Sequence, residues 1–346
     1  MAFFRNIITL AAFCLPVSLS AATFTAVSFS SISGWQQDDH ATALAAFARS
    51  CGGMRSTPAI PVREWDKVCV LAKAGPGPAR AFFEQNFTPV RISTGARALF
   101  TGYYEPELNG SRTETEKFRF PLYRRPPEIQ TGEAWHSRAE IDNGALEGRE
   151  LELVWLDNPV DAFFVHVQGA ARVRMADGSF MRVGFAGRNW QPYRSVGREL
   201  IRQGVLTPNQ AGMLGIRAWV AANPAAGRLA LQHNTSFIFF QELEIPDELG
   251  PLGALRVPLA PLRSVAVDDS HTPLGAPVWI NMSAGVHSLS QLMVAQDTGS
   301  AVNGAQRADI FYGSGDAAGD KAGNIRYSGE MITLIPNATA ARLRAH

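Results

Sequence analysis

Hydrophobic and polar side chains alternate along residues 163–185, which is the clearest pattern in the chain. The alternating positions are Val165, Val167, Gly169, Ala171 and Val173 against His166, Gln168, Ala170, Arg172 and Arg174. A period of two is typical of a strand with one buried face. Asp177-Gly178 then supplies a tight turn. The pattern therefore predicts a β-hairpin with one apolar and one polar face.

Helical periodicity marks residues 36–90, which carry almost no strand signal. Asp38 or Asp39 can cap the first helix, because a short side-chain oxygen there accepts from free backbone N–H groups. Pro78 is well placed to begin another helix. We expect the N-terminal part to be helical.

Two more helical stretches follow the hairpin, over residues 193–203 and 208–224. Pro208 lies where a helix can start, and Pro224 lies beyond the expected end. A strand pattern then returns over residues 236–243.

Short apolar runs separated by Gly and Pro follow residue 250. They occupy residues 255–261, 263–269, 277–282, 290–297, 308–313 and 332–336. Such spacing, without helical crossovers long enough for a parallel α/β sheet, indicates a closed barrel. The fold class predicted is therefore mainly β with a helical N-terminal part.

The first 22 residues are typical of a secretory signal peptide, with one Arg ahead of an apolar run and small residues at its end. A membrane anchor is the weaker alternative, because the run is short and Pro16 interrupts it. A lipidated Cys normally follows a small residue, but Phe13 precedes Cys14. We expect export and a soluble mature protein.

Cys51 and Cys69 are the two cysteines left after removal of that segment. Each lies on a short stretch with helical periodicity. An even pair in an exported chain predicts a disulfide, since the compartment is oxidising. Two buried free thiols are the alternative.

Composition excludes some partners. The chain is 46% hydrophobic and 18% charged over 346 residues, which allows a large core and leads us to expect two domains. A net charge of +1 provides no basic field for nucleic acid. No Cys/His cluster has metal-ligand spacing, so we expect no metal and no cofactor.

Asp297-Thr-Gly-Ser, over residues 297–300, matches the tetrapeptide around the catalytic carboxylates of pepsin-like proteases. Those enzymes need two such loops, because two carboxylates share one proton. Asp269-Ser270 continues to His271 rather than Gly, and Gln296 stands where a buried strand is usually apolar. The tetrapeptide therefore indicates a turn rather than a protease.

Six stretches together resemble the membrane-bound lytic murein transglycosylase A family, in order and across most of the mature chain. They are FTGYYEPELNGS (100–111), YRRP (123–126), FVHVQGAARV (164–173), NTSFIFF (234–240), VPLAPLRSVAVDDSHTPLGAPVWI (257–280) and QDTGSAVNGAQRADIFYGSGDAAG (296–319). The resemblance implies a peptidoglycan-cleaving enzyme with a double-psi β-barrel and a groove between two domains. It divides the chain into a barrel from 23–106 plus 243–346 and an inserted β-rich domain from 107–242. The missing lipobox puts membrane anchoring in doubt.

Three aspartates of the barrel fall on Asp268, Asp297 and Asp309 by this resemblance. The catalytic acid precedes an Ile-aromatic-aromatic run, which selects Asp309. One carboxyl is enough for a lytic transglycosylase, because the muramoyl C6 hydroxyl is the nucleophile and a 1,6-anhydro product forms. The apolar run 310–312 can raise the pKa of this acid. Asp268 and Asp297 are expected to support it by accepting backbone N–H bonds.

Substrate-binding candidates are expected in the TGYYEP and HVQGA stretches, because aromatic faces stack on sugars and fixed polar groups bind hydroxyls. They are Thr101, Gly102, Tyr103, Tyr104 and Gln168. Adjacent strand residues face opposite sides, so only one tyrosine need face the groove. His166 shares the polar face with Gln168, although a lone His is more often structural.

Three functions compete with the transglycosylase. A murein-binding protein that does not catalyse is disfavoured by retention of Asp309. A water-using muramidase requires a second carboxylate, for which Glu105, Asp268 and Asp297 stay open. The pepsin-like protease is the weakest.

Overall fold

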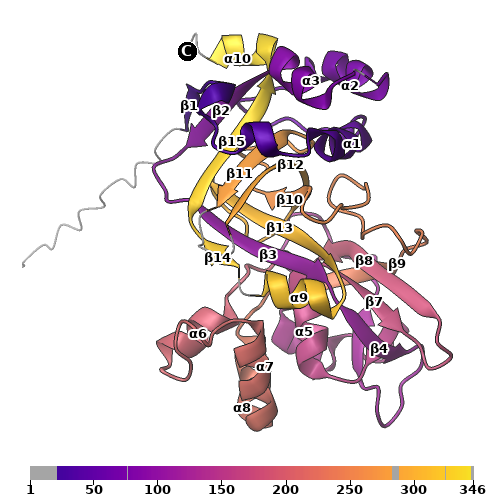
Figure 1. The fold of residues 1–346 in the computed structure, drawn as a ribbon. Helices are drawn as coiled ribbons and strands as arrows, with labels where there is room; N and C mark the ends of the chain where they lie inside the picture. Colours follow the sequence, from indigo (N-terminus) through magenta and orange to yellow (C-terminus); the bar gives the residue numbers. More distant parts are fainter. Residues whose placement is uncertain (1–21, 76, 283–287, 324, 344–346) are drawn as a thin grey trace, which may run out of the picture.

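The computed structural model of the protein describes residues 22–75, 77–282, 288–323 and 325–343. Cys14 and nearly all of the expected signal peptide lie outside the described residues. Two mixed β-sheets and the helices around them form the described structure. In Figure 1, α1, α2, α3 and α10 lie at one end of the molecule and α6, α7 and α8 at the other.

The first sheet has nine strands in the order β1-β2-β15-β11-β12-β10-β13-β3-β14. Their bounds are β1 Thr23–Ala26, β2 Phe87–Ser93, β3 Leu99–Glu105, β10 Ser264–Val267, β11 Pro277–Met282, β12 Leu289–Thr298, β13 Arg307–Ser314, β14 Arg326–Tyr327 and β15 Gly329–Pro336. β10 pairs in parallel with β12, and β13 with β3. Among the described residues, no pairing of β1 with β14 joins the two edges.

The second sheet has six strands in the order β5-β6-β4-β7-β8-β9, all from residues 107–242. Their bounds are β4 Glu107–Ser111, β5 Phe120–Tyr123, β6 Glu152–Leu156, β7 Ala170–Arg174, β8 Phe180–Arg188 and β9 Ile238–Glu242. β7 and β8 form the antiparallel hairpin expected around Asp177-Gly178. The expected strand over 236–243 is β9.

The helices are spread along the described part of the chain. They are α1 His40–Ser50, α2 Trp65–Lys73, α3 Ala79–Asn86, α4 Arg138–Glu140, α5 Pro159–Gln168, α6 Val196–Arg202, α7 Met213–Ala222, α8 Pro224–Gln232, α9 Asp316–Ala322 and α10 Asn337–Leu343, with short 3-10 turns at Phe29–Ser31 and Trp35–Gln37 and a π-helical turn at Ile141–Ala145. Asp39 caps α1 by accepting from the N–H groups of Ala41 and Thr42. Pro78 precedes α3 as expected.

The strand expected at the start of the 163–185 hairpin is wrong, because residues 159–168 form helix α5. Asn158 caps this helix by accepting from two backbone N–H groups, and Pro159 occupies its first turn. Gly169 ends it with a left-handed φ of 87°. These end signals and tertiary packing outweigh the β-propensity of the valines, so His166 and Gln168 lie on the last helical turn.

Two other expectations need correction. Residues 255–261 form no strand, and only an isolated bridge joins Leu252 to Pro258. The helix expected from Pro208 starts instead at Met213, and Pro224 opens the next helix, α8. A proline ends one helix but is also compatible with the first turn of another.

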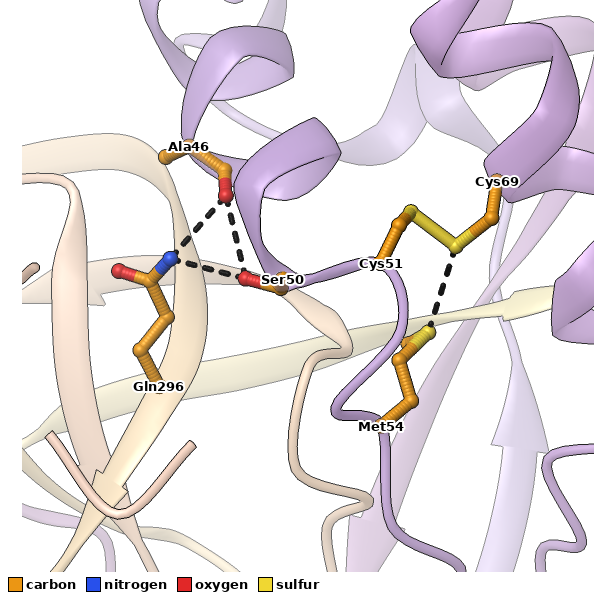
Figure 2. Close-up of a disulfide and its surroundings, with 6 residues drawn as sticks. All are labelled: Ala46, Ser50, Cys51, Met54, Cys69 and Gln296. Atoms are coloured by element: carbon orange, nitrogen blue, oxygen red, sulfur yellow. Dashed lines mark hydrogen bonds between the residues drawn. A yellow bond between two sulfur atoms is a disulfide. The ribbon is translucent and has the colours of Figure 1, made fainter. Parts of the chain in front are cut away.

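Helices α1, α2 and α3 cover one face of the nine-stranded sheet with a large apolar cluster. Phe47, Phe83, Phe87 and Trp279 are fully buried within it. The Cys51–Cys69 disulfide joins the end of α1 to α2, as Figure 2 shows, which confirms the pairing expected from the sequence. Closing a loop of this length contributes roughly 3 kcal/mol on the chain-entropy model.

Gln296 explains the polar residue before the DTGS turn. Its side chain is fully buried, and Nε2 donates to Ala46 O at 3.0 Å and to Ser50 Oγ at 2.8 Å (Figure 2). The Oε1 atom accepts from Ser264 Oγ. This amide therefore ties the end of β12 to α1 and to β10, and fixes the strand that delivers Asp297.

Candidate active site

A cavity of about 1110 Å³ is lined by residues from both sheets and by the coil around residues 251–256. The nine-stranded sheet and its loops contribute Tyr103, Asp268 and Asp297. Opposite them, the region of the six-stranded sheet contributes Gln168, Phe185, Trp190 and other side chains. A cavity of this volume, lined by both polar and aromatic side chains, can accept a large ligand.

Asp309 lies in the middle of β13, paired with Ala266 of β10 and Thr101 of β3. Its Oδ1 atom accepts from Thr101 Oγ1 at 2.6 Å, and Thr101 Oγ1 accepts from Arg307 at 2.8 Å. Its Oδ2 atom has no hydrogen-bond partner among the described residues. Burial raises the pKa of Asp309, against the opposing effects of the Arg307 charge and the Thr101 hydrogen bond.

Asp309 does not itself line the cavity, but its negative charge affects the pKa values of two residues that do. It adds to the burial that raises the pKa values of Asp297 and Tyr193, and both of these residues line the cavity. Asp309 is also only partly buried. Its carboxyl is therefore close to the cavity wall and within electrostatic range of a bound ligand.

Both oxygens of Asp297 accept hydrogen bonds. Oδ1 accepts from the N–H groups of Ala254 and Thr298, each at 2.9 Å, and Oδ2 accepts from Tyr103 OH at 3.0 Å. Burial raises the pKa of Asp297 to about 6 despite these bonds. Burial and then the Asp297 charge hold the pKa of Tyr103 well above its usual value, so this phenol stays a donor.

Asp268 ties two loops together. Its Oδ1 atom accepts from the N–H and the Oγ of Ser270, at 3.0 and 2.6 Å, and Oδ2 accepts from Gly304 N at 2.6 Å. Burial alone would raise the pKa of Asp268, but these hydrogen bonds lower it overall. This carboxylate is therefore ionised and held by backbone donors.

Three of the five expected substrate-binding residues line the cavity, namely Tyr103, Tyr104 and Gln168. The side chains of the two tyrosines have different surroundings, as expected for adjacent strand residues: Tyr103 OH donates to Asp297, whereas the Tyr104 ring packs against α9 and its OH donates to Met213 Sδ. Gln168 Oε1 accepts from Tyr104 N at 3.0 Å, which joins α5 to β3. Thr101 does not line the cavity, and its hydroxyl donates to Asp309 Oδ1.

Gly102 lies where α9 approaches β3 closely. A Cβ atom there would lie 2.8 Å from the Cα of Ala322, so the glycine lets α9 approach β3. Gly102 is not among the cavity-lining residues.

Sequence analysis did not predict a group of cavity residues in the last part of β8 and just after it. Phe185 is 48% exposed, which is unusual for a large apolar side chain. The Arg188 guanidinium lies 4.3 Å from the centre of the Trp190 ring, and Trp190 has a positive φ of 57°. The only signal was the aromatic-rich NWQPY sequence after a strand, and such a run does not reveal whether its rings are buried.

No three His, Cys, Asp or Glu side chains within the described ranges gather as metal ligands would. In the same part of the chain, every helix is too short or too polar to cross a bilayer.

Comparison with known proteins identifies the family. The MltA specific insert domain matches residues 99–241, and the 3D domain matches residues 263–335. A crystal structure of a membrane-bound lytic murein transglycosylase from Agrobacterium tumefaciens is 36% identical, with a TM-score of 0.86, over 93% of this chain and 100% of that one. This chain belongs to the membrane-bound lytic murein transglycosylase A family.

Other relatives agree with this assignment. MltA from Neisseria gonorrhoeae is 33% identical with a TM-score of 0.75, over 91% of this chain and 93% of that chain. Escherichia coli MltA with bound chitohexaose is 28% identical with a TM-score of 0.72, over 90% and 94% of the two chains. Membrane-bound lytic murein transglycosylase A of Vibrio cholerae is 34% identical over 247 residues, which are 68% of this chain and 65% of that protein.

Proposed function

We propose that this protein is a lytic murein transglycosylase. It cleaves the β-1,4 bond between N-acetylmuramic acid and N-acetylglucosamine in peptidoglycan and leaves a 1,6-anhydromuramoyl end. Family membership supports the reaction class. The observation that carries the assignment is the Asp309 carboxyl, which is held by Thr101 through one oxygen and has its other oxygen free of hydrogen bonds with the described residues.

In this mechanism Asp309 is the only acid and base. It first donates its proton to the glycosidic oxygen as the bond to the anomeric carbon breaks, which needs a carboxyl whose pKa is raised. It then accepts the proton of the C6 hydroxyl as that oxygen bonds to the anomeric carbon. No water enters the product, and the proton returned to Asp309 restores the enzyme.

Hydrogen bonding favours Asp309 over Asp297 for this role. Every oxygen of Asp297 already accepts from a fixed donor, two of them backbone N–H groups, and these bonds favour the ionised form. Asp309 has one oxygen available to carry and release a proton. Asp297 and Asp268 instead fix the loops around the acid through bonds from backbone N–H groups.

A water-using muramidase would require a second free carboxylate. Glu105 is unsuitable, because its carboxylate is fully buried against Arg182, 2.8 Å away. Asp268 and Asp297 are occupied by backbone donors. The single-acid mechanism therefore fits the side chains better.

We further propose that residues 23–106 and 243–346 form the catalytic domain and residues 107–242 the inserted one, with a glycan strand in the cavity between them. The division is supported by the two sheets, whose strands separate at these positions. A double-psi barrel for the first domain is supported by two parallel pairs, β10 with β12 and β13 with β3, joined by antiparallel β10 and β13. Chitohexaose binding by the E. coli relative supports a glycan ligand.

The periplasm is the proposed location. The Cys51–Cys69 disulfide supports an oxidising compartment, and the signal-like N-terminus supports export. The relatives are described as membrane-bound, whereas Phe13 before Cys14 speaks against lipidation here. We therefore propose a soluble periplasmic protein, with no cofactor and no nucleic-acid partner.

Digestion of purified murein sacculi tests the proposed reaction. The protein is expected to release muropeptides ending in 1,6-anhydro-N-acetylmuramic acid, one water lighter than muramidase products. Mass spectrometry of the soluble fraction distinguishes the outcomes. Reducing ends would indicate a muramidase, and sacculus binding without release would indicate a binding protein.

The pH profile tests the role given to Asp297. The Asp309 charge adds to the burial that raises the pKa of Asp297 to about 6. Coupling between two carboxyls is reciprocal, so an ionised Asp297 disfavours ionisation of Asp309. Asp297→Asn removes the charge, and the alkaline limb of the rate profile is expected to move to lower pH. An unmoved limb would contradict the coupling.

Stability must be followed in the same experiment. The folded-state pKa of Asp297 lies above the usual aspartate value of 3.8, so the folded state binds more protons than the unfolded state between about pH 4 and 6. Its contribution to stability is present below that window and is lost as the pH rises through it. Thermal unfolding at each pH separates this effect from the change in rate.

A further inference from the structure

His166 is a histidine of the cavity wall that the mechanism above does not use. It lies on the last turn of α5, and its Nδ1 atom accepts from the backbone N–H of Ile238 at 3.2 Å. Its ring packs on Phe237 and Phe240, with centroids 4.1 and 5.2 Å apart. One hydrogen bond and two buried rings therefore fix the orientation of the imidazole.

The Ile238 contact also fixes the tautomer. A ring nitrogen that accepts a hydrogen bond carries no proton in the neutral imidazole, so the proton lies on Nε2. Nε2 has no hydrogen-bond partner among the described residues, and His166 lines the cavity. The wall therefore offers an oriented N–H donor to whatever occupies the cavity.

Burial and one neighbouring positive charge keep the His166 imidazole neutral. Burial and then the positive charge of Arg138 hold the pKa of His166 well below its usual value. Arg138 is itself buried, 4.9 Å from the centre of the Phe237 ring, and it donates to the carbonyls of Asn234 and Ser236. Protonation of Nδ1 would also break the bond from Ile238.

The surroundings of His166 combine donors with apolar surface. Gln168 Oε1 accepts from Tyr104 N, so the N–H groups of the Gln168 amide can donate to a ligand. Ala170, Ile238 and Phe185 line the same cavity with apolar atoms. A neutral donor beside apolar surface matches an acetamido group, whose carbonyl oxygen accepts and whose methyl is apolar.

We propose that His166 binds the acetamido carbonyl of an N-acetyl sugar through Nε2–H, so that this wall selects 2-acetamido glycans over glycans with a hydroxyl at C2. The inference rests on the proposed glycan-binding function and names the group that the cavity recognises. It assigns no proton transfer to His166.

Paired substitutions test the proposal in an Asp309→Asn background, which prevents turnover. His166→Asn keeps an oxygen near the position of Nδ1 but has no group at the position of Nε2. His166→Gln places an amide N–H near Nε2. Calorimetry with chitohexaose and with cellohexaose, a neutral ligand of the same linkage with C2 hydroxyls, measures the preference.

The starting protein is expected to bind chitohexaose more tightly than cellohexaose. His166→Asn is expected to weaken chitohexaose about five- to tenfold, the effect of one neutral hydrogen bond, with cellohexaose affected less than twofold. His166→Gln is expected to recover part of the loss. Equal weakening of both ligands, no weakening, or no preference in the starting protein would overturn the proposal.

A second measurement needs no change at position 166. In protein labelled with ¹⁵N-histidine, the His166 Nε2–H resonance is expected to shift with chitohexaose and much less with cellohexaose. An equal response to both would again overturn the proposal. If sacculi yield anhydro products but the protein does not prefer acetamido glycans, the role of His166 is contradicted and the proposed reaction stands. If the protein prefers acetamido glycans but yields no anhydro products, the proposed reaction is contradicted and the role of His166 stands.

Discussion

Asp309→Asn is expected to lower muropeptide release from sacculi by a factor of about 10² to 10⁴, the range that general acid–base catalysis contributes. An amide has nearly the shape of the carboxyl and can still accept from Thr101, but it cannot donate the proton that the leaving oxygen needs. Release is measured as soluble anhydromuropeptides over time. Thermal unfolding and pelleting with sacculi establish that fold and binding persist.

Asp297→Asn is the matched control, because it makes the same chemical change in a second carboxyl near the cavity. Its carbonyl can still accept from Ala254 and Thr298, so the loop is retained. We expect this variant to keep most of the release at acidic pH. The assignment is reversed if Asp297→Asn is inactive while Asp309→Asn still releases anhydro products.

Arg182→Met is expected to lower the free energy of unfolding by ~3–5 kcal/mol, because it leaves a buried carboxylate without its cation. Arg182 on β8 and Glu105 at the end of β3 are 5% and 1% exposed, with Nε and Oε1 2.8 Å apart. Glu105 Oε2 also accepts from Ser314 Oγ at 2.6 Å, and Arg182 donates to Pro246 O at 3.2 Å. The pair thus joins the two sheets beside β13. Urea unfolding of both proteins measures the difference in the free energy of unfolding.

An exposed ion pair provides the comparison. Arg112 and Glu242 lie 2.9 Å apart, but the Arg112 side chain is 59% exposed, so Arg112→Met is expected to cost less than about 1 kcal/mol. The double variant Glu105→Leu with Arg182→Met is expected to regain much of the lost stability, since neither charge is then left unpaired. Similar losses for Arg182→Met and Arg112→Met would contradict the importance of burial.

Local signals in the sequence determined much of the fold. The strands within residues 263–336 follow from short apolar runs separated by Gly and Pro. The cap at Asp39 and the start of α3 after Pro78 follow from residues that act on their immediate neighbours. The disulfide followed from two cysteines in a chain with an export signal. The family followed from six stretches in a fixed order. Such features depend on residues close in sequence, or on motifs whose residue types are themselves informative.

Tertiary contacts decided what the sequence could not. The valines of α5 alternate as they would in a strand, but the segment is a helix, which places His166 Nδ1 against the N–H of Ile238, 72 residues away. Phe185 is a large apolar residue of the kind usually found in a core, but it lies exposed in the cavity. The sequence allowed Glu105 as a catalytic carboxylate, but its buried contact with Arg182, 77 residues later, argues against that role. Burial, charge pairing and the tautomer of a histidine depend on which distant groups are brought together, and local patterns carry no record of those contacts.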